Sequence, residues 1–260
     1  MRYYTFLFIS LFLLNFESLF SQNETLDDIH LFQTFFRDAR IAEAAYGQAT
    51  LGFSDFDDAD MINLGVTGAI PINPQFEIGG SIAFLNVDPN TGNGESGLSD
   101  LRMTGRYHFQ SRNLTKITAG GFLTLPIGKD ELGQGEINLG VFGAVRHPIG
   151  ASTVLTGTLS LDFLKGAPVG NGGWPRLSVL SANRETALLL GGGIIHQINT
   201  QLSFVGELNL VTEGEFGMIS GGLDHKLQSG GRLRGTLGLG LDDGAPDLAI
   251  VISFLHFFEN

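Results

Sequence analysis

The sequence contains no cysteine, which excludes a disulfide scaffold, a lipid-modified N-terminal cysteine and any thiolate metal site. Proline is scarce, with 8 residues, whereas glycine contributes 37. Charged residues make up only 16% of the chain, and acidic side chains outnumber basic ones to give a formal net charge of -12. This balance argues against nucleic acid as a partner, because few basic groups are present to neutralise phosphates.

A long uninterrupted apolar run is also missing. The chain begins with one basic residue, Arg2, then an apolar run from Phe6 to Leu14 and a more polar stretch that ends at Gln22. The run is too short for a membrane helix and has the form of a secretory signal peptide. We therefore assign residues 1–21 to a removable signal peptide. Because no later stretch supplies the roughly 18 apolar residues of a membrane helix, a mature protein embedded in a membrane must cross it as strands.

The stretch from Leu98 to Phe109 separates into two chemically different faces when its residues are taken by twos. Side chains on a strand alternate between faces, so the pattern predicts a strand and does not fit a helix. The apolar face ends in Tyr107 and Phe109 just before a polar turn, as barrel strands do where they leave the lipid. One strand of a soluble sandwich or of a lipocalin-like barrel is the alternative. The polar face carries Asp100, Arg102, Thr104, Arg106 and His108.

From about Ala42 onward the chain continues as alternating segments of about ten residues, separated by turn residues. About twelve segments follow one another, at residues 42–53, 62–72, 76–87, 98–109, 114–127, 136–149, 153–165, 186–198, 202–212, 217–227, 232–243 and 248–258. An even number of such segments is typical of an outer-membrane barrel.

The connections between these segments alternate in length. Five are tight, at residues 73–75, 110–113, 150–152, 199–201 and 228–231, and those in between are mostly longer, such as Ser54–Asp60 and Gly166–Glu185. Outer-membrane barrels combine short periplasmic turns with longer external loops, a rule that a soluble sandwich has no reason to follow. The sequence therefore predicts an all-β fold, in which residues 41–260 form a transmembrane antiparallel up-and-down β-barrel of about 12 strands in a bacterial outer membrane.

Residues 22–40 differ from the rest of the chain. Thr25 followed by Asp28 resembles a capping box, and the apolar residues after them recur at helical spacing. We predict an N-terminal helical segment with a short amphipathic helix from about Leu26 to Arg37. Three placements remain open, since the helix can plug the barrel, lie on the periplasmic membrane surface or form a loose leader.

If the apolar side chains of each strand face lipid, the polar ones line the lumen. Both signs of charge occur in similar numbers, so these groups can pair across neighbouring strands and fill a narrow interior. A selective solute path is the alternative, because a barrel of this size lies between eight-stranded barrels, filled by side chains, and sixteen-stranded porins. The predicted lumen-lining residues are Glu77, Asp100, Arg102, Arg106, His108, Lys116, Glu136, Arg146, Asp162, Glu207, Asp224, Lys226, Arg232, Arg234 and Asp242.

The acidic stretch Ser54–Asp60 matches a calcium-binding loop only in part. Asp55 and Asp57 fit the first two ligand positions, but no glutamate follows at the closing position. Catalysis needs a nucleophile beside a base, and no recognisable arrangement of that kind surrounds the histidines of the predicted strands. The histidines considered are His147, His196, His225 and His256. The sequence therefore predicts no metal site, no cofactor and no enzyme activity.

Two motifs carry a resemblance to a known family. GLSDLRMTGRYHF at Gly97–Phe109 and FLTLPIGKDE at Phe122–Glu131 are similar to the G-x-x-D-L-x-x-x-x-[KR]-Y and L-P-x-G-K-D patterns of the MetA-pathway-of-phenol-degradation family, whose members are transporter-like outer-membrane barrels. The C-terminal LAIVISFLHFFEN resembles the last strand that the barrel-assembly machinery recognises, although Glu259 and Asn260 follow the final aromatic residue.

The resemblance implies a channel or transporter for passive or facilitated uptake of small molecules, with hydrophobic or aromatic compounds as candidate solutes. It also implies outer-membrane lipid and the barrel-assembly machinery as partners. The alternative is a non-transporting structural or adhesive barrel in the outer membrane, which presents external loops such as Gly166–Glu185.

Overall fold

A computed structural model of the chain describes most of the region after the predicted signal peptide. The described residues are 26, 28–109, 114–129, 132–133, 135–164 and 185–258. The predicted signal peptide and nearly all of the Gly166–Glu185 connection lie outside them. Within the described residues, no helix is long and apolar enough to cross a membrane.

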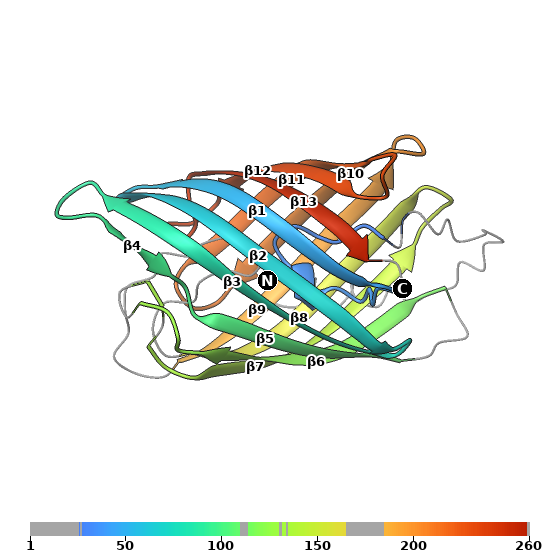
Figure 1. Cartoon of the computed structure of the whole chain (residues 1–260), viewed down its shortest axis with the longest axis horizontal. Coiled ribbons are helices and arrows are strands. Elements are labelled where there is room, and N and C mark those ends of the chain that lie inside the picture. Colours follow the sequence, from blue (N-terminus) through green and yellow to red (C-terminus); the bar gives the residue numbers. More distant parts are fainter. Residues whose placement is uncertain are drawn as a thin grey trace, which may run out of the picture.

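The alternating segments form antiparallel strands that close into a 12-strand barrel (Figure 1). The strands are β1 (Ala45–Phe56), β2 (Ala59–Asn73), β3 (Phe76–Pro89), β4 (Glu95–Leu98), β5 (Leu101–Phe109), β6 (Lys116–Leu125), β7 (Asn138–Pro148), β8 (Thr153–Leu164), β9 (Glu185–Gln197), β10 (Leu202–Val211), β11 (Phe216–Lys226), β12 (Arg232–Gly240) and β13 (Leu248–Phe258). Each strand pairs with its neighbours in the chain, and β1 pairs with β13 to close the ring. The predicted up-and-down barrel is therefore confirmed.

The predicted strand 98–109 is interrupted in the structure. Its first part is the short strand β4, which pairs with the C-terminal half of β3. Its second part is β5, which pairs with the N-terminal half of β3. Between them Ser99 and Asp100 leave the strand conformation, and Ser99 Oγ accepts a hydrogen bond of 2.9 Å from Ala83 N. The two pieces occupy one place in the wall, so 13 strand labels describe 12 barrel positions.

The strand register follows the predicted pattern. Phe76 faces Tyr107 across the β3–β5 pair, and the apolar side chains that alternate along the strands point outward. Leu64 on β2 is 58% exposed and Leu237 on β12 is 56% exposed. An outward face made of large apolar side chains is unstable in water and matches the hydrocarbon layer of a membrane.

The prediction of a longer loop at Ser54–Asp60 is wrong. Strands β1 and β2 extend through most of Ser54–Asp60, so the predicted longer loop is a tight turn at Asp57 and Asp58. The tight turn arises because the alternation of inward and outward side chains continues to Phe56 and resumes at Ala59. At this end of the barrel the rule of long connections does not hold for the first hairpin.

The helix predicted from Leu26 to Arg37 is not shown. Within the described residues of this segment, the helical element is η1, a single 3₁₀ turn at Phe35–Arg37. Residues 29–42 are all buried, and the segment lies inside the barrel (Figure 1). Of the three open placements, the structure has the segment within the lumen. We call residues 28–42 the plug.

Candidate functional site: the plugged lumen

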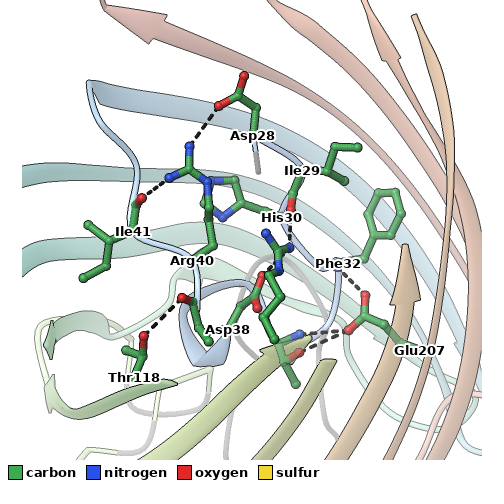
Figure 2. A network of polar contacts seen from close by, with 12 residues as sticks. Asp28, Ile29, His30, Phe32, Asp38, Arg40, Ile41, Thr118 and Glu207 are labelled. Atoms are coloured by element: carbon green, nitrogen blue, oxygen red, sulfur yellow. Dashed lines mark hydrogen bonds and ion pairs between the residues drawn. The ribbon is translucent and has the colours of Figure 1, made fainter. Parts of the chain in front are cut away.

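One carboxylate of the wall holds the backbone of the plug. Glu207 on β10 is buried, and its side chain accepts hydrogen bonds from the backbone N–H groups of Phe32, Gln33 and Thr34 (Figure 2). The bonds from Gln33 and Thr34 measure 3.1 and 3.2 Å. Hydrogen bonds to an ionised acceptor are stronger than neutral ones. This contact therefore fixes the position of the plug along the β10 side of the lumen.

Two ion pairs fix the plug to neighbouring strands. Arg37 of the plug pairs with Asp162 on β8 at 2.5 Å, and Asp38 of the plug pairs with Arg146 on β7 at 2.8 Å. Arg146 also donates a hydrogen bond of 2.6 Å to the Ile29 carbonyl. All four charged side chains are buried. One pair has its cation on the plug and the other has its cation on the wall. The two pairs together therefore add no net charge to either the plug or the wall.

A third cluster lies where the plug passes into β1. Glu77 on β3 and Arg106 on β5 form a fully buried ion pair at 2.5 Å. Glu77 also accepts hydrogen bonds from Tyr46 Oη and from Ala42 N, each of 3.2 Å. Arg106 donates to the Asp38 carbonyl at 3.2 Å. The cluster thus joins two wall strands to each other and to the end of the plug.

A fourth cluster stands on the opposite side of the lumen. Asp224 on β11 accepts hydrogen bonds from Arg232 at 2.6 Å and from Arg234 at 2.9 Å. Arg234 also donates to the Gln48 side chain on β1 and to the His30 carbonyl of the plug. Its guanidinium lies 4.4 Å from the centre of the Phe32 ring. One arginine therefore contacts both the backbone and an aromatic ring of the plug.

Glycines in the wall make room for the plug. A Cβ atom at Gly79 on β3 would lie 2.6 Å from the Phe36 ring, and one at Gly193 on β9 would lie 3.1 Å from the Leu31 side chain. Such distances are shorter than normal contacts, so any larger residue at these positions would push into the plug. The glycine content of the strands thus has a packing role at these positions.

Replacing Gly79 by valine is expected to displace the plug without disrupting the barrel. The new methyl groups would overlap the Phe36 ring, at a cost of about 1–3 kcal/mol to the plugged form. Reconstituted in planar bilayers, the variant should then conduct more ions than the unmodified protein, because the plug no longer fills the lumen. The matched control is Gly143→Val, because Gly143 lies on the lipid-facing side of β7 and a Cβ there meets no atom within 4 Å. If folded Gly79→Val protein conducts no more than the unmodified protein, displacing the plug opens no passage through the lumen.

The structure places most of the predicted lumen residues around the plug. Nine are buried, namely Glu77, Asp100, Arg106, Arg146, Asp162, Glu207, Asp224, Arg232 and Arg234. Arg102, His108, Lys116, Glu136 and Lys226 are half-buried. Asp100 and Glu136 lie in connections between strands, and Asp100 accepts a hydrogen bond from Gly128 N. Asp242 is exposed in the connection after β12, so its prediction as a lumen residue is wrong.

The sequence did not indicate the plug side of these contacts. Arg37 is the last residue of the predicted helix and Asp38 follows it, and no pattern in the sequence singles out His30. Tyr46 and Gln48 share the inward parity of β1, so the alternation rule applied to β1 would have identified them. No signal in the sequence links Arg37 to Asp162, because 125 positions separate them.

The lumen has a second zone with a different chemistry. Toward the end of the barrel opposite the chain termini, many inward side chains are large, apolar and buried, and they alternate with polar ones such as Asn63, Asn138 and Asn209. The apolar ones include Phe56, Met61, Leu85, Phe122, Phe142, Leu164, Leu189, Val211, Phe216, Met218 and Val251. The guanidinium of Arg102 stacks on the Phe122 ring at 3.4 Å and marks the boundary. We call this outer part the apolar zone.

A cavity of about 670 Å³ opens below the plug. Plug residues and the β2–β3 turn form its walls, and His108 and Lys116 contribute from β5 and β6. Outer-membrane barrels have their short turns at the periplasmic end, and the β2–β3 turn here is short, so we call this cavity the vestibule. Between the vestibule and the apolar zone, the plug fills the charged part of the lumen.

Two of the strand histidines form hydrogen bonds with neighbouring threonines. His147 bonds to Thr115 and His196 bonds to Thr153, each at 2.8 Å. In the part of the chain that the structure describes, no three histidine, aspartate or glutamate side chains are placed to hold a metal ion. Asp55 and Asp60 face each other across the first hairpin, in a turn too short to wrap around a cation.

No family model matches the chain, and no curated protein matches its sequence. Solved structures do match it. An outer-membrane channel from Pseudomonas putida F1 aligns over 85% of this chain and 98% of its own length, with a TM-score of 0.68 and 13% identity. The chain has the fold of an outer-membrane barrel. The KdgM and NanC porins each align over 82% of this chain and 99% and 100% of their own, with TM-scores of 0.56 and identities of 9% and 10%.

The transport unit of the autotransporter AIDA-I from Escherichia coli also aligns, over 84% of this chain and 91% of its own, with a TM-score of 0.53 and 10% identity. Barrels with different cargo therefore share this architecture, and at such identities the likeness is one of fold. The resemblance to the MetA-pathway-of-phenol-degradation family stays a prediction.

Proposed function

We propose that the protein is an outer-membrane channel for small hydrophobic or aromatic molecules and that the plug gates it. The observation that carries the proposal is the apolar zone. Inward side chains of a water-filled porin are polar, whereas here aliphatic and aromatic groups make up a large part of the lining of the outer lumen. Transfer of an apolar solute from water to such a lining is favourable, whereas transfer of a hydrated ion costs much free energy.

The fold supports passage through the barrel, since channels and porins are among its structural neighbours. The exposed apolar strand faces support lipid as the surrounding medium, and the aromatic end of β13 supports assembly by the barrel-assembly machinery. The signal peptide proposed for residues 1–21 would bring the chain to the periplasm. We propose no cofactor and no catalytic role.

A structural or adhesive barrel is the second candidate. The plug favours it, because a charged lumen filled by its own chain needs no passage to be stable. The two candidates differ in one outcome: a gated channel transfers solute when the plug is displaced, whereas a scaffold does not.

Uptake of the apolar dye N-phenyl-1-naphthylamine by cells with an intact outer membrane tests the proposed solute class. Cells that produce the protein should take up the dye several-fold faster than cells without it. Leu189→Asn places an amide in the apolar zone and should slow uptake, whereas Leu190→Asn, on the lipid face of the same strand, should not. Equal uptake with and without the folded protein, also in the Gly79→Val variant, would reject the proposed function.

A further inference from the structure

A histidine lies in the middle of the plug with no hydrogen-bond partner for its ring. His30 is fully buried, and within the described residues neither Nδ1 nor Nε2 has a partner. The imidazole stacks on Phe35 of the plug, with ring centres 4.5 Å apart and an angle of 18° between the planes. On its other side the Tyr46 ring lies at 4.8 Å. The ring is therefore packed as a neutral aromatic group.

The charged side chains that act most strongly on the His30 ring are arginines. Arginines approach from four elements, namely Arg40 of the plug, Arg106 of β5, Arg146 of β7 and Arg234 of β12. The nearby carboxylates already bind those arginines, in the pairs Asp28–Arg40, Glu77–Arg106, Asp38–Arg146 and Asp224–Arg234. Glu207 is engaged with the plug backbone, and Tyr46 donates to Glu77. None of these groups forms an ion pair with the imidazole.

Protonation of His30 in this place is unfavourable for two reasons. Burial removes the water that would solvate an imidazolium ion, and the four arginines repel it. Both causes, with burial the larger, lower the pKa of the His30 imidazole well below its usual range. His30 belongs to the plug and not to a strand of the wall, so it becomes solvated when the plug leaves.

We propose that His30 makes the plug a proton-sensitive gate, which is closed while the imidazole is neutral and is released by acid. The proposal rests on the proposed function, because it assumes that displacing the plug opens a passage. The contacts of the ring are with the aromatic rings of Phe35 and Tyr46, which an aromatic side chain without a titratable group can also make.

The direction of the pH effect follows from the two states. In the released plug His30 has an ordinary pKa of about 6.5, and in the plugged form its pKa is lower. Above pH 6.5 neither state binds the proton, so the plugged form keeps its full stability. As the pH falls below this value only the released state takes up the proton. The ratio of released to plugged barrels then rises by up to about tenfold per pH unit, until the pH reaches the lowered pKa.

Single-channel recordings of the full-length protein between pH 7.5 and pH 5 test the inference. The unmodified protein should open more often as the pH falls, by up to about tenfold per unit below pH 6.5. His30→Phe keeps an aromatic ring in the stack and keeps every carboxylate, so it should remove the pH response and leave the closed state at pH 7.5 unchanged. His196→Gln, on the wall at the periplasmic end, should retain the response.

The result that overturns the inference is an equal pH response in the unmodified protein and in folded His30→Phe. A flat response in the unmodified protein also overturns it, provided that the Gly79→Val variant opens. If no variant opens at any pH, the proposed function itself fails, which is a different outcome. Migration of the folded band on gels before and after heating shows that each variant is a folded barrel.

Discussion

Replacing both Arg37 and Asp38 by alanine is expected to open the channel most of the time. The substitutions remove both ion pairs between plug and wall, Arg37 with Asp162 and Asp38 with Arg146. In the plugged form Asp162 and Arg146 would stay buried without these counter-charges, whereas in the released form water solvates them. Breaking a buried pair costs about 3–5 kcal/mol, and even 3 kcal/mol shifts the equilibrium more than a hundredfold towards the released plug.

Conductance of the reconstituted double variant measures this shift. The control is the pair Lys129→Ala and Glu95→Ala, which removes an ion pair of the same type whose side chains are 39% and 44% exposed. Exposed pairs contribute little to stability, so the control should behave as the unmodified protein. A folded Arg37→Ala/Asp38→Ala barrel that conducts nothing would favour the scaffold over the channel.

Replacing Arg106 alone by alanine is expected to lower the stability of the barrel. Arg106 and Glu77 are fully buried on adjacent strands, and the carboxylate would lose its counter-charge in both plugged and released forms near the β3–β5 pair. The expected loss is about 3–5 kcal/mol in the free energy of unfolding. The temperature at which the folded band disappears on a gel should fall accordingly.

A second substitution separates the charge effect from lost packing. Glu77→Leu combined with Arg106→Leu replaces the pair by apolar groups of similar volume, and such replacements are often neutral. The double variant should therefore regain most of the stability that Arg106→Ala loses. If Arg106→Ala has the stability of the unmodified protein, the buried pair has no net role in the wall.

These two predictions separate two kinds of charged residue in one lumen. The ion pairs Glu77–Arg106 and Asp224–Arg234 each join two strands of the wall, so their loss should lower stability. Asp162 and Arg146 form ion pairs across the gap to the plug, so they should control gating. Of the two interpretations of the lumen that the sequence left open, the structure has the paired charges of a filled interior, and the solute path stays a proposal.

The wall of the barrel could be predicted from the sequence because strand alternation is a local property. Whether Arg106 points inward depends on the backbone of its own strand, and a partner such as Glu77 follows from the register of the adjacent strand. The loop prediction for Ser54–Asp60 was wrong for a related reason. The acidic residues suggest a loop, although the alternation of inward and outward side chains continues through most of the stretch. The apolar zone could be read only once inward positions from all strands were collected at the same height.

The sequence by itself determined the up-and-down barrel, its lipid-facing side chains and most of the charged positions inside it. The tertiary structure decided that residues 28–42 fill the lumen, that Glu207 binds their backbone and that His30 is buried among arginines. Gln33 and Glu207 are 174 positions apart, and a carboxylate that accepts backbone N–H groups sets no requirement on the side chains of the plug. Only a closed barrel around the segment brings these groups together, because the interior selects for volume and hydrogen bonds that no local pattern records.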